Sequence, residues 1–295
     1  MYTIFLLGSI LFTSYLTLAF KVCEKYRIDI FQAIVFNYIT CVVTGSFVNG
    51  AFPVNTQSLS NAWFQWGLVM GLFFIGLFNL ISITVINDGV AVATVSNKLS
   101  LVIPVMLAVY LYGEKVAGFK MVGIIAALVA VVLTCYQSKT NRFAGAAAAK
   151  RFSYFLPLVL FIGSGMLDSI INHVQKKYIT EENQNAFLIT GFFSAATVGA
   201  AILGIQYARN KKIFAGRHLL AGIIIGVPNY FSIWCMMKFL KTSPMQSSAN
   251  IPVNNMGIVL FSSVMAGVLF KEKLSFINWT GILLSIAAIA LIAFG

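Results

Sequence analysis

The sequence predicts an all-α integral membrane protein in which ten transmembrane helices form two inverted five-helix repeats. Three observations support this fold class: the composition, the spacing of the apolar runs, and a pattern that occurs twice. Hydrophobic residues make up 59% of the 295 residues, charged residues make up 9%, and the mean hydropathy is +0.90. A soluble globular domain carries far more charge, so this composition excludes one.

The first half of the sequence contains five apolar runs, each long enough for a helix that crosses the roughly 30 Å hydrocarbon core of a bilayer. The first run begins at the initiator with no basic leader and no small-residue cleavage site, which indicates a retained helix and not a signal peptide. Asn87-Asp88-Gly89 is a turn signal after the third run. The five runs cover about residues 2–22, 30–49, 62–86, 90–112 and 119–136.

The second half contains five further apolar runs. They cover about residues 152–174, 186–207, 219–240, 247–270 and 276–294. Between the halves lies KTNRFAGAAAAKR, the only stretch of the sequence that looks like a linker. We therefore predict a first repeat over residues 1–140, a linker loop over 141–152, and a second repeat over 153–295.

The last two helices of each predicted repeat share one pattern. At an offset of 158 positions, Asn97 aligns with Asn255 and Gly123 with Gly281, and a Glu-Lys pair also recurs. Because each repeat has an odd number of spans, the second repeat enters the membrane from the opposite side. The repeats are thus predicted to be inverted, with a pseudo-two-fold axis in the membrane plane.

Two pairs of glycines extend the repeat to the third helix of each half. Gly67 and Gly71 align with Gly222 and Gly226 at an offset of 155 positions. Small residues at this four-residue spacing let two helix backbones approach closely, so both pairs are predicted to lie at helix contacts.

Short charged hairpins carry a family resemblance. Each half closes with an apolar helix, a Glu-Lys hairpin (Gly113-Glu114-Lys115 and Lys271-Glu272-Lys273) and a glycine-containing last helix. With ten spans in two halves, the chain resembles the drug/metabolite transporter (DMT) superfamily, specifically its EamA-like permeases. The resemblance covers essentially the whole chain. It implies a transporter, in a superfamily that includes amino-acid exporters, sugar-phosphate and nucleotide-sugar carriers, and multidrug pumps.

The formal charge of +12 comes from Lys and Arg residues in short loops, which indicates positive-inside topology and not nucleic-acid binding. The loops after the first, fifth, seventh and ninth runs carry roughly twice as many basic residues as the others, which predicts both termini outside the cell. The resemblance instead implies cytoplasmic termini, so the orientation stays open. We expect a multi-pass protein of the bacterial inner membrane, monomeric or homodimeric.

Two charged residues fall deep within predicted spans. Lys98 lies about ten residues into the fourth span, and Asp168 lies about sixteen residues into the sixth. A charge at this depth costs roughly 2.5–3.5 kcal/mol, so such residues usually face a partner or a watery cavity. Lys98 is expected to bind an anionic group of the substrate, with Asp168 as its counter-ion or as a proton-titrating carboxylate. The alternative is a structural ion pair between helices.

Polar and aromatic side chains complete the predicted substrate site. Asn172 follows Asp168 at the four-residue spacing of one helix face, and the fourth and ninth spans carry further amides. Asn and Ser side chains in membranes also serve as hydrogen bonds between helices, which is the alternative for each. The remaining candidates are Asn79, Asn97, Tyr230, Trp234, Asn250, Asn254 and Asn255.

These features favour a secondary transporter that moves a small organic metabolite, such as an amino acid or another zwitterionic or anionic solute, by alternating access. A passive channel or a lipid flippase is the alternative, and a membrane-embedded enzyme is less favoured because no catalytic motif occurs. The four cysteines are scattered singly, and there is no Walker A sequence. We therefore expect no enzyme activity, no metal and no cofactor.

Overall fold

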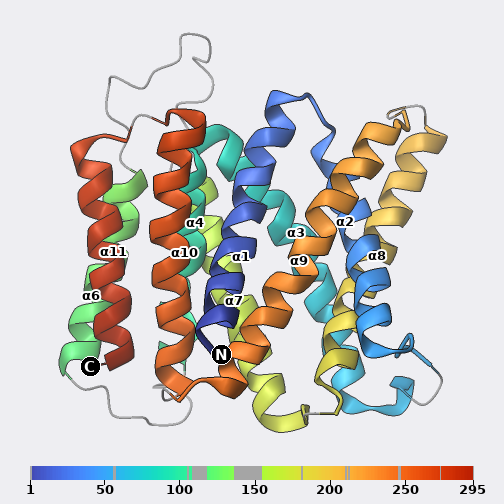
Figure 1. Cartoon of the computed structure of the whole chain (residues 1–295), viewed down its shortest axis with the longest axis horizontal. Coiled ribbons are helices and arrows are strands. Elements are labelled where there is room, and N and C mark those ends of the chain that lie inside the picture. The colour runs from blue at the N-terminus through green and yellow to red at the C-terminus, as the bar shows by residue number, and fades with distance from the viewer. Residues whose placement is uncertain are drawn as a thin grey trace. The chain divides into compact units, whose positions relative to one another are not determined.

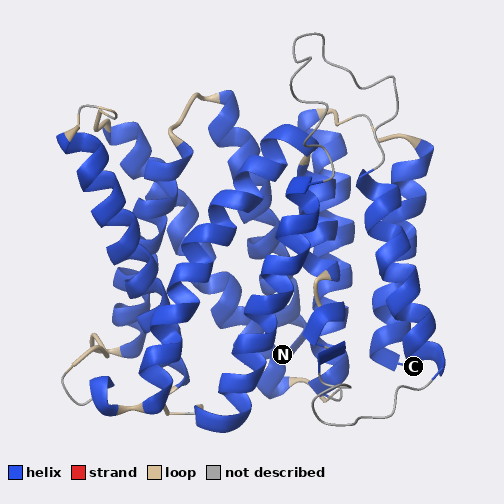
Figure 2. Cartoon of the chain, turned by 180° about the vertical axis from the view of Figure 1, so that it is seen from behind, coloured by secondary structure: helices blue, strands red, loops and turns tan. Residues whose placement is uncertain are grey.

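The computed structural model describes residues 2–55, 58–104, 106–107, 118–135, 155–180, 182–209, 211, 213–244, 247–272 and 274–294. In chain order the α-helices are α1 (Tyr2–Lys25), α2 (Ile30–Asn49), α3 (Ala62–Asp88), α4 (Val90–Leu99), α6 (Gly118–Cys135), α7 (Phe155–Tyr178), α8 (Gln184–Ala208), α9 (Gly216–Thr242), α10 (Ser247–Phe270) and α11 (Phe276–Phe294). These residues hold no strand (Figure 2). Six of the helices are long and apolar enough to cross a membrane. The all-α prediction is thus confirmed.

Local signals in the sequence explain where several helices begin and end. The carboxylate of Asp29 accepts a hydrogen bond from the Gln32 N–H at 3.1 Å and so caps the start of α2. Gly50 follows α2 with φ of 78°, a left-handed conformation that favours glycine. Gly89 has φ of 99° and separates α3 from α4, so the predicted turn at this position is confirmed.

The described chain divides into two compact units that do not follow the order of the sequence. Unit 1 comprises Met1–Lys21, Ile81–Met166 and Phe231–Gly295, and unit 2 comprises Val22–Leu80 and Leu167–Tyr230. Each unit therefore draws on both halves of the sequence. The helices α1, α3, α7 and α9 each contribute one segment to unit 1 and one to unit 2.

Unit 1 is built around helices that are distant in the sequence. Helix α6 packs along α11, and α10 packs on both α4 and α11 (Figure 1). Val95, Leu99, Ala127 and Ile289 belong to the buried apolar cluster at these contacts. The side-chain amide of Asn278 donates to the carbonyl of Thr134 at 2.8 Å and adds a polar link between α11 and α6.

Unit 2 is centred on the contact between α2 and α8. Tyr38 of α2 is buried among Phe74, Phe78 and Phe192, with ring centroids 5.6–6.3 Å apart. Its hydroxyl donates to the carbonyl of Phe74 at 2.8 Å, so the polar end of the ring is also satisfied. Aromatic packing of this kind holds the helices in fixed relative positions.

The predicted glycine contacts are confirmed within unit 2. A Cβ atom added at Gly71 would lie 2.5 Å from the carbonyl oxygen of Gly191, and one at Gly226 would lie 2.7 Å from that of Asn37. Helix α3 thus crosses α8, and α9 crosses α2, each through the equivalent glycine of the predicted repeat. Neither position has room for a larger residue unless the helices separate.

Glycines also lie at the contact between α6 and α11 in unit 1, one on each helix. A Cβ atom added at Gly123 of α6 would lie 3.0 Å from the carbonyl oxygen of Ala288, and one at Gly281 of α11 would lie 2.6 Å from the backbone nitrogen of Thr134. Both helices therefore use a glycine to approach the backbone of the other. These two glycines align at the offset of 158 positions.

The fourth predicted span is broken, because α4 ends at Leu99, residues 100–101 form a turn, and helical backbone resumes at Val102. Pro104 lacks the N–H that would bond to the Ser100 carbonyl, and its ring crowds that carbonyl. The Ile103 N–H bonds to it instead at 2.9 Å, and the Ser100 hydroxyl donates to the Asn97 carbonyl at 2.5 Å. The Glu114 hairpin and the 141–152 linker lie outside the described residues.

Candidate functional site

The first half of α10 is a polar segment within an apolar bundle. Asn250 and Asn254 lie four residues apart on one face of the helix, and Asn255 follows directly. All three are buried, with exposed fractions of 1%, 4% and 8%. Pro252 lies among them and removes one backbone N–H from the helix.

Two of these side chains each have one amide atom without a hydrogen-bond partner among the described residues. The Oδ1 atom of Asn250 accepts from the Ser243 hydroxyl at 2.8 Å, but its Nδ2 atom has no partner. The Oδ1 atom of Asn254 has none either. A buried polar group without a hydrogen bond costs roughly 1–3 kcal/mol, so these atoms are suited to bonding a polar solute or water.

Helix α4 lies against this polar segment. The Nδ2 atom of Asn255 donates to the backbone carbonyl of Lys98 at 3.5 Å, at the end of α4 where carbonyls lack helical partners. The hydroxyls of Thr94 and Ser96 are buried on α4 without partners in the described chain. Unit 1 thus brings together Lys98 and Asn255, two of the predicted site residues.

The side chains of Asn97 and Lys98 are half-buried in the last turn of α4. A cation at a helix C-terminus is stabilised by the helix macrodipole. This local effect helps to explain why a lysine is tolerated within a long apolar region.

Helix α1 approaches α10 close to the same segment. Gly257 of α10 faces the side chain of Ile10, and an added Cβ atom would overlap it. Asn254 lies one turn before Gly257, and Ser9 is next to Ile10 in the sequence. The Ser9 hydroxyl is buried without a partner in the described chain, as is that of Ser14 five residues later.

The predicted aromatic residues Trp234 and Tyr230 fall in different units. Trp234 belongs to unit 1, where its half-buried ring meets Phe5 and Phe231 edge-on at 5.8 and 6.1 Å. The Lys238 ammonium lies 5.5 Å from its ring centroid. Tyr230 belongs to unit 2, is 1% exposed, and faces Gly45 of α2.

The other predicted site residues also belong to unit 2. Asp168 is half-buried on α7, and the side chain of Asn172 lies outside the described part of the chain. The Nδ2 atom of Asn79 donates to the Ile75 carbonyl of its own helix at 2.7 Å. Since Lys98 belongs to unit 1, a pairing between Lys98 and Asp168 stays a prediction.

The structure places Asn37, Asn229 and Glu272, which are not among the predicted site residues, at polar contacts. Asn37 of α2 is fully buried and accepts a hydrogen bond from the Asn229 amide at 3.0 Å. The carboxylate of Glu272 accepts from the Val90 N–H at 3.1 Å, at the start of α4. An amide inside an apolar run was the signal for Asn37, as it was for Asn250. Within the described chain, no three His, Cys, Asp or Glu side chains lie close enough to hold a metal.

Two known proteins are similar to this chain over almost its whole length. An uncharacterized protein of Haemophilus influenzae is 26% identical over 292 residues, which cover 96% of this chain and 95% of the relative. A solved crystal structure of a protein matches 99% of this chain and 96% of its own chain, with a TM-score of 0.61 and 16% identity. This second likeness shows that the fold extends over the whole chain.

The family model of the EamA-like transporters matches residues 155–294, from the start of α7 to the end of α11. The family is part of the DMT superfamily, so the predicted resemblance is confirmed. With its apolar helices and this match over its second half, the chain is an integral multi-pass membrane protein that is similar to the EamA-like transporter family.

Proposed function

We propose that the protein is a secondary transporter of a small zwitterionic or anionic organic solute, such as an amino acid, in the bacterial inner membrane. The observation that carries this proposal is the polar segment of α10. Its buried amide atoms on Asn250 and Asn254 lack partners among the described residues, close to the end of α4 that carries Lys98. A polar solute that bonds these amides would offset the cost of burying them.

Lys98 is the reason that we propose an anionic or zwitterionic solute. An ammonium in a low-dielectric site attracts a carboxylate or phosphate more strongly than it does in water. Asn97 and Asn255 would then orient the solute beside it, and Trp234 would supply an apolar surface. Asp168, with Asn172 four residues later, is proposed as the counter-ion of Lys98 or as a carboxylate that binds the coupling proton. Asn79 and Tyr230 are the remaining proposed contacts.

Alternating access by two inverted repeats is the mechanism that we propose. The support comes from reciprocal contacts between corresponding helices. Helix α2 packs on α8, α4 on α10 and α6 on α11, and aligned glycines make equivalent contacts in both directions. Equivalent contacts in both directions are expected when two copies of one repeat are related by a pseudo-two-fold axis. The repeats proposed are residues 1–140 and 153–295, joined by the loop 141–152.

The purified full-length chain in proteoliposomes provides the test. We expect labelled amino acids or organic acids to enter with saturable kinetics, and we expect unlabelled solute inside the vesicles to drive counterflow. Non-saturating flux without counterflow would indicate the passive-channel alternative. Movement of labelled lipid between leaflets would indicate a flippase, and chemical conversion of the solute would indicate an enzyme.

Proton coupling is tested in the same vesicles with an imposed pH gradient. If Asp168 binds the coupling proton, D168N abolishes the dependence of uptake on the gradient but leaves solute exchange measurable. An unchanged pH profile in D168N removes Asp168 from the coupling step.

A further inference from the structure

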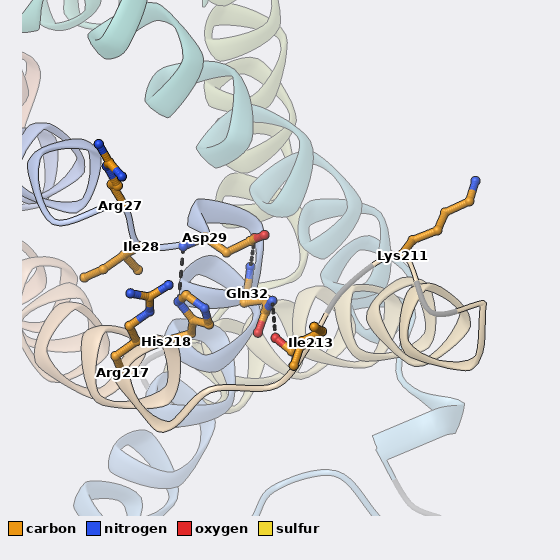
Figure 3. Close-up of a pocket in the computed structure, with 8 residues that line it drawn as sticks. All are labelled: Arg27, Ile28, Asp29, Gln32, Lys211, Ile213, Arg217 and His218. Carbon is orange, nitrogen blue, oxygen red and sulfur yellow. Dashed lines mark hydrogen bonds between the residues drawn. The ribbon is translucent and has the colours of Figure 1, made fainter.

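The turn between α1 and α2 and the segment before α9 form a pocket in unit 2, separate from the residues proposed to bind the transported solute (Figure 3). The pocket has a volume of about 520 Å³ and is open to the surface. Asp29 lies at the start of α2, and Arg217 lies in the first turn of α9. The pocket is therefore located where two apolar helices begin.

Buried side chains fix the floor of this pocket. The Asp29 N–H donates to Nδ1 of His218 at 3.1 Å, and Nε2 of Gln32 donates to the Ile213 carbonyl at 3.2 Å. The Tyr207 hydroxyl in turn donates to Oε1 of Gln32 at 2.8 Å. His218 and Gln32 are 5% and 1% exposed. These bonds tie the two segments together, so the pocket is a built feature of unit 2.

Positive charge predominates in the lining. Arg27, Lys211 and Arg217 are exposed cations, whereas Asp29 is the only acidic side chain among the lining residues and is used as the cap of α2. Arg217 lies beside His218, whereas Lys211 points away from the other side chains (Figure 3). The N-terminal ends of α2 and α9 add a partial positive charge. The pocket therefore favours an anion.

The backbone of Arg27 has φ of 51°, a left-handed conformation that is uncommon for residues with a Cβ atom. A glycine would adopt this conformation with less strain. The Arg27 N–H bonds to the Glu24 carbonyl and the Ile28 N–H to the Cys23 carbonyl, so this conformation closes the end of α1 and leaves the Arg27 side chain at the pocket.

Apolar side chains border the cations. Ile213 lines the pocket and is 83% exposed, and the neighbouring Phe214 is 55% exposed. Inorganic phosphate has no apolar part that could contact these side chains, whereas the acyl chains of a lipid are apolar and can pack against them. Cations for a headgroup beside exposed apolar side chains are the arrangement expected at the edge of a bilayer.

We propose that this pocket binds the phosphate of an anionic phospholipid, with Arg27 and Arg217 as the principal ligands and the acyl chains along Ile213 and Phe214. The cations belong to loops whose basic excess predicts the cytoplasmic side, where anionic headgroups attract Lys and Arg. A soluble phosphate shares the headgroup chemistry, and the test separates the two sources.

The test measures binding of phosphatidylglycerol to the purified full-length chain in phosphatidylcholine nanodiscs, by native mass spectrometry and by the shift of the thermal unfolding midpoint. A Lys or Arg that contacts the anionic headgroup contributes about fivefold in affinity, so R27Q/R217Q is expected to bind roughly 25-fold more weakly. The matched control is K25Q/R209Q, which removes two exposed cations of the same segments outside the pocket. It is expected to bind nearly as the parent chain does.

The charge-preserving variant R27K/R217K is expected to retain most of the binding. Equal binding by the parent chain and R27Q/R217Q would overturn the proposal, as would equal losses in the pocket variant and its control. If R27Q/R217Q does not fold, R27Q and R217Q are measured singly, and unchanged binding in both overturns the proposal. If inorganic phosphate alone reproduces the full thermal shift, the ligand is a soluble phosphate and the lipid assignment is wrong.

Discussion

Buried asparagines occur in both units, but their amide groups differ in what they contact. In unit 2, Asn229 donates to Asn37 and so links α9 to α2. In unit 1, the Oδ1 atom of Asn254 and the Nδ2 atom of Asn250 have no partner among the described residues. Unit 2 also contains buried polar atoms without a partner among the described residues, such as the Nδ2 atom of Asn37. In unit 1, buried polar atoms of this kind occur on α1, α4 and α10.

This difference distinguishes two uses of polar groups in an apolar bundle. A satisfied amide stabilises a helix contact by about 0.6–2 kcal/mol and limits its movement. An unsatisfied one contributes nothing to the contact and stays available for another molecule. We infer that the Asn229–Asn37 pair stabilises a helix contact, whereas the unpaired amide atoms of Asn250 and Asn254 are available to a solute. The following substitutions test this comparison.

The largest effect is expected from K98M. Loss of the ammonium should weaken binding of an anionic solute by about 2–5 kcal/mol, because the carboxylate is left without its opposite charge. Uptake of labelled anionic solutes in proteoliposomes measures this effect, with K120M on α6 as the control. Preferred uptake of cations by the parent chain would contradict the proposed role.

The double variant K98M/D168N separates solute binding from a structural ion pair. If K98M lowers the unfolding midpoint and the added D168N restores it, the two side chains form a structural pair. If K98M keeps the parental midpoint and loses binding, Lys98 acts on the solute.

A smaller loss, in stability and not in binding, is expected from N229L. The change removes the donor to the fully buried Asn37, and a buried acceptor that loses its partner costs about 1–3 kcal/mol. The thermal unfolding midpoint in detergent should fall. A parental midpoint would show that this amide pair does not stabilise the helix contact.

Gly226 tests the close approach of α9 to α2. In G226A the added methyl group would lie 2.7 Å from the Asn37 carbonyl oxygen, and overpacking of this kind costs about 1–3 kcal/mol. Gly204 of α8 has no atom within 4 Å of an added Cβ atom, so G204A should be neutral or stabilising by up to about 1 kcal/mol. Equal unfolding midpoints for the two variants would contradict the glycine contact.

The smallest change in stability is expected from N254L, within about 0.5 kcal/mol of the parent, because a buried amide whose Oδ1 atom has no partner among the described residues is replaced by an apolar group of similar size. Transport should nevertheless fall by up to about tenfold, as one hydrogen bond to the solute is lost. If N254L destabilises the chain as much as N229L does, the contrast between these two amides is wrong.

The helices and the glycine contacts could be predicted from the sequence because apolar runs and four-residue spacings are local patterns. The interruption of α4 was missed, although Pro104 was visible, because the length of the apolar run was taken as the length of the helix. The division into two units could not be predicted. It depends on contacts between distant helices, such as α6 and α11, that no local pattern encodes.

The polar residues of the proposed site could be predicted from the sequence, but their arrangement in space could not. Asn250, Asn254 and Asn255 stood out as polar residues in an apolar run, and they are buried as a group. Tyr230 and Trp234 lie one turn apart in the sequence, yet they belong to different units. Hydrogen-bond satisfaction also depends on neighbours that the sequence does not identify, so Asn229 and Asn254 look alike until their partners are known.

The pairing of α6 with α11 has a consequence for how the chain is made. Helix α6 ends at Cys135, whereas α11 begins at Phe276, so a ribosome that adds roughly 5–20 residues per second completes α6 about 10–30 s before its partner exists. During that interval α6 can pack on α4, but the face that carries Gly123 lacks its partner. The mainly apolar sequence of α6 is compatible with a stable span before α11 completes unit 1.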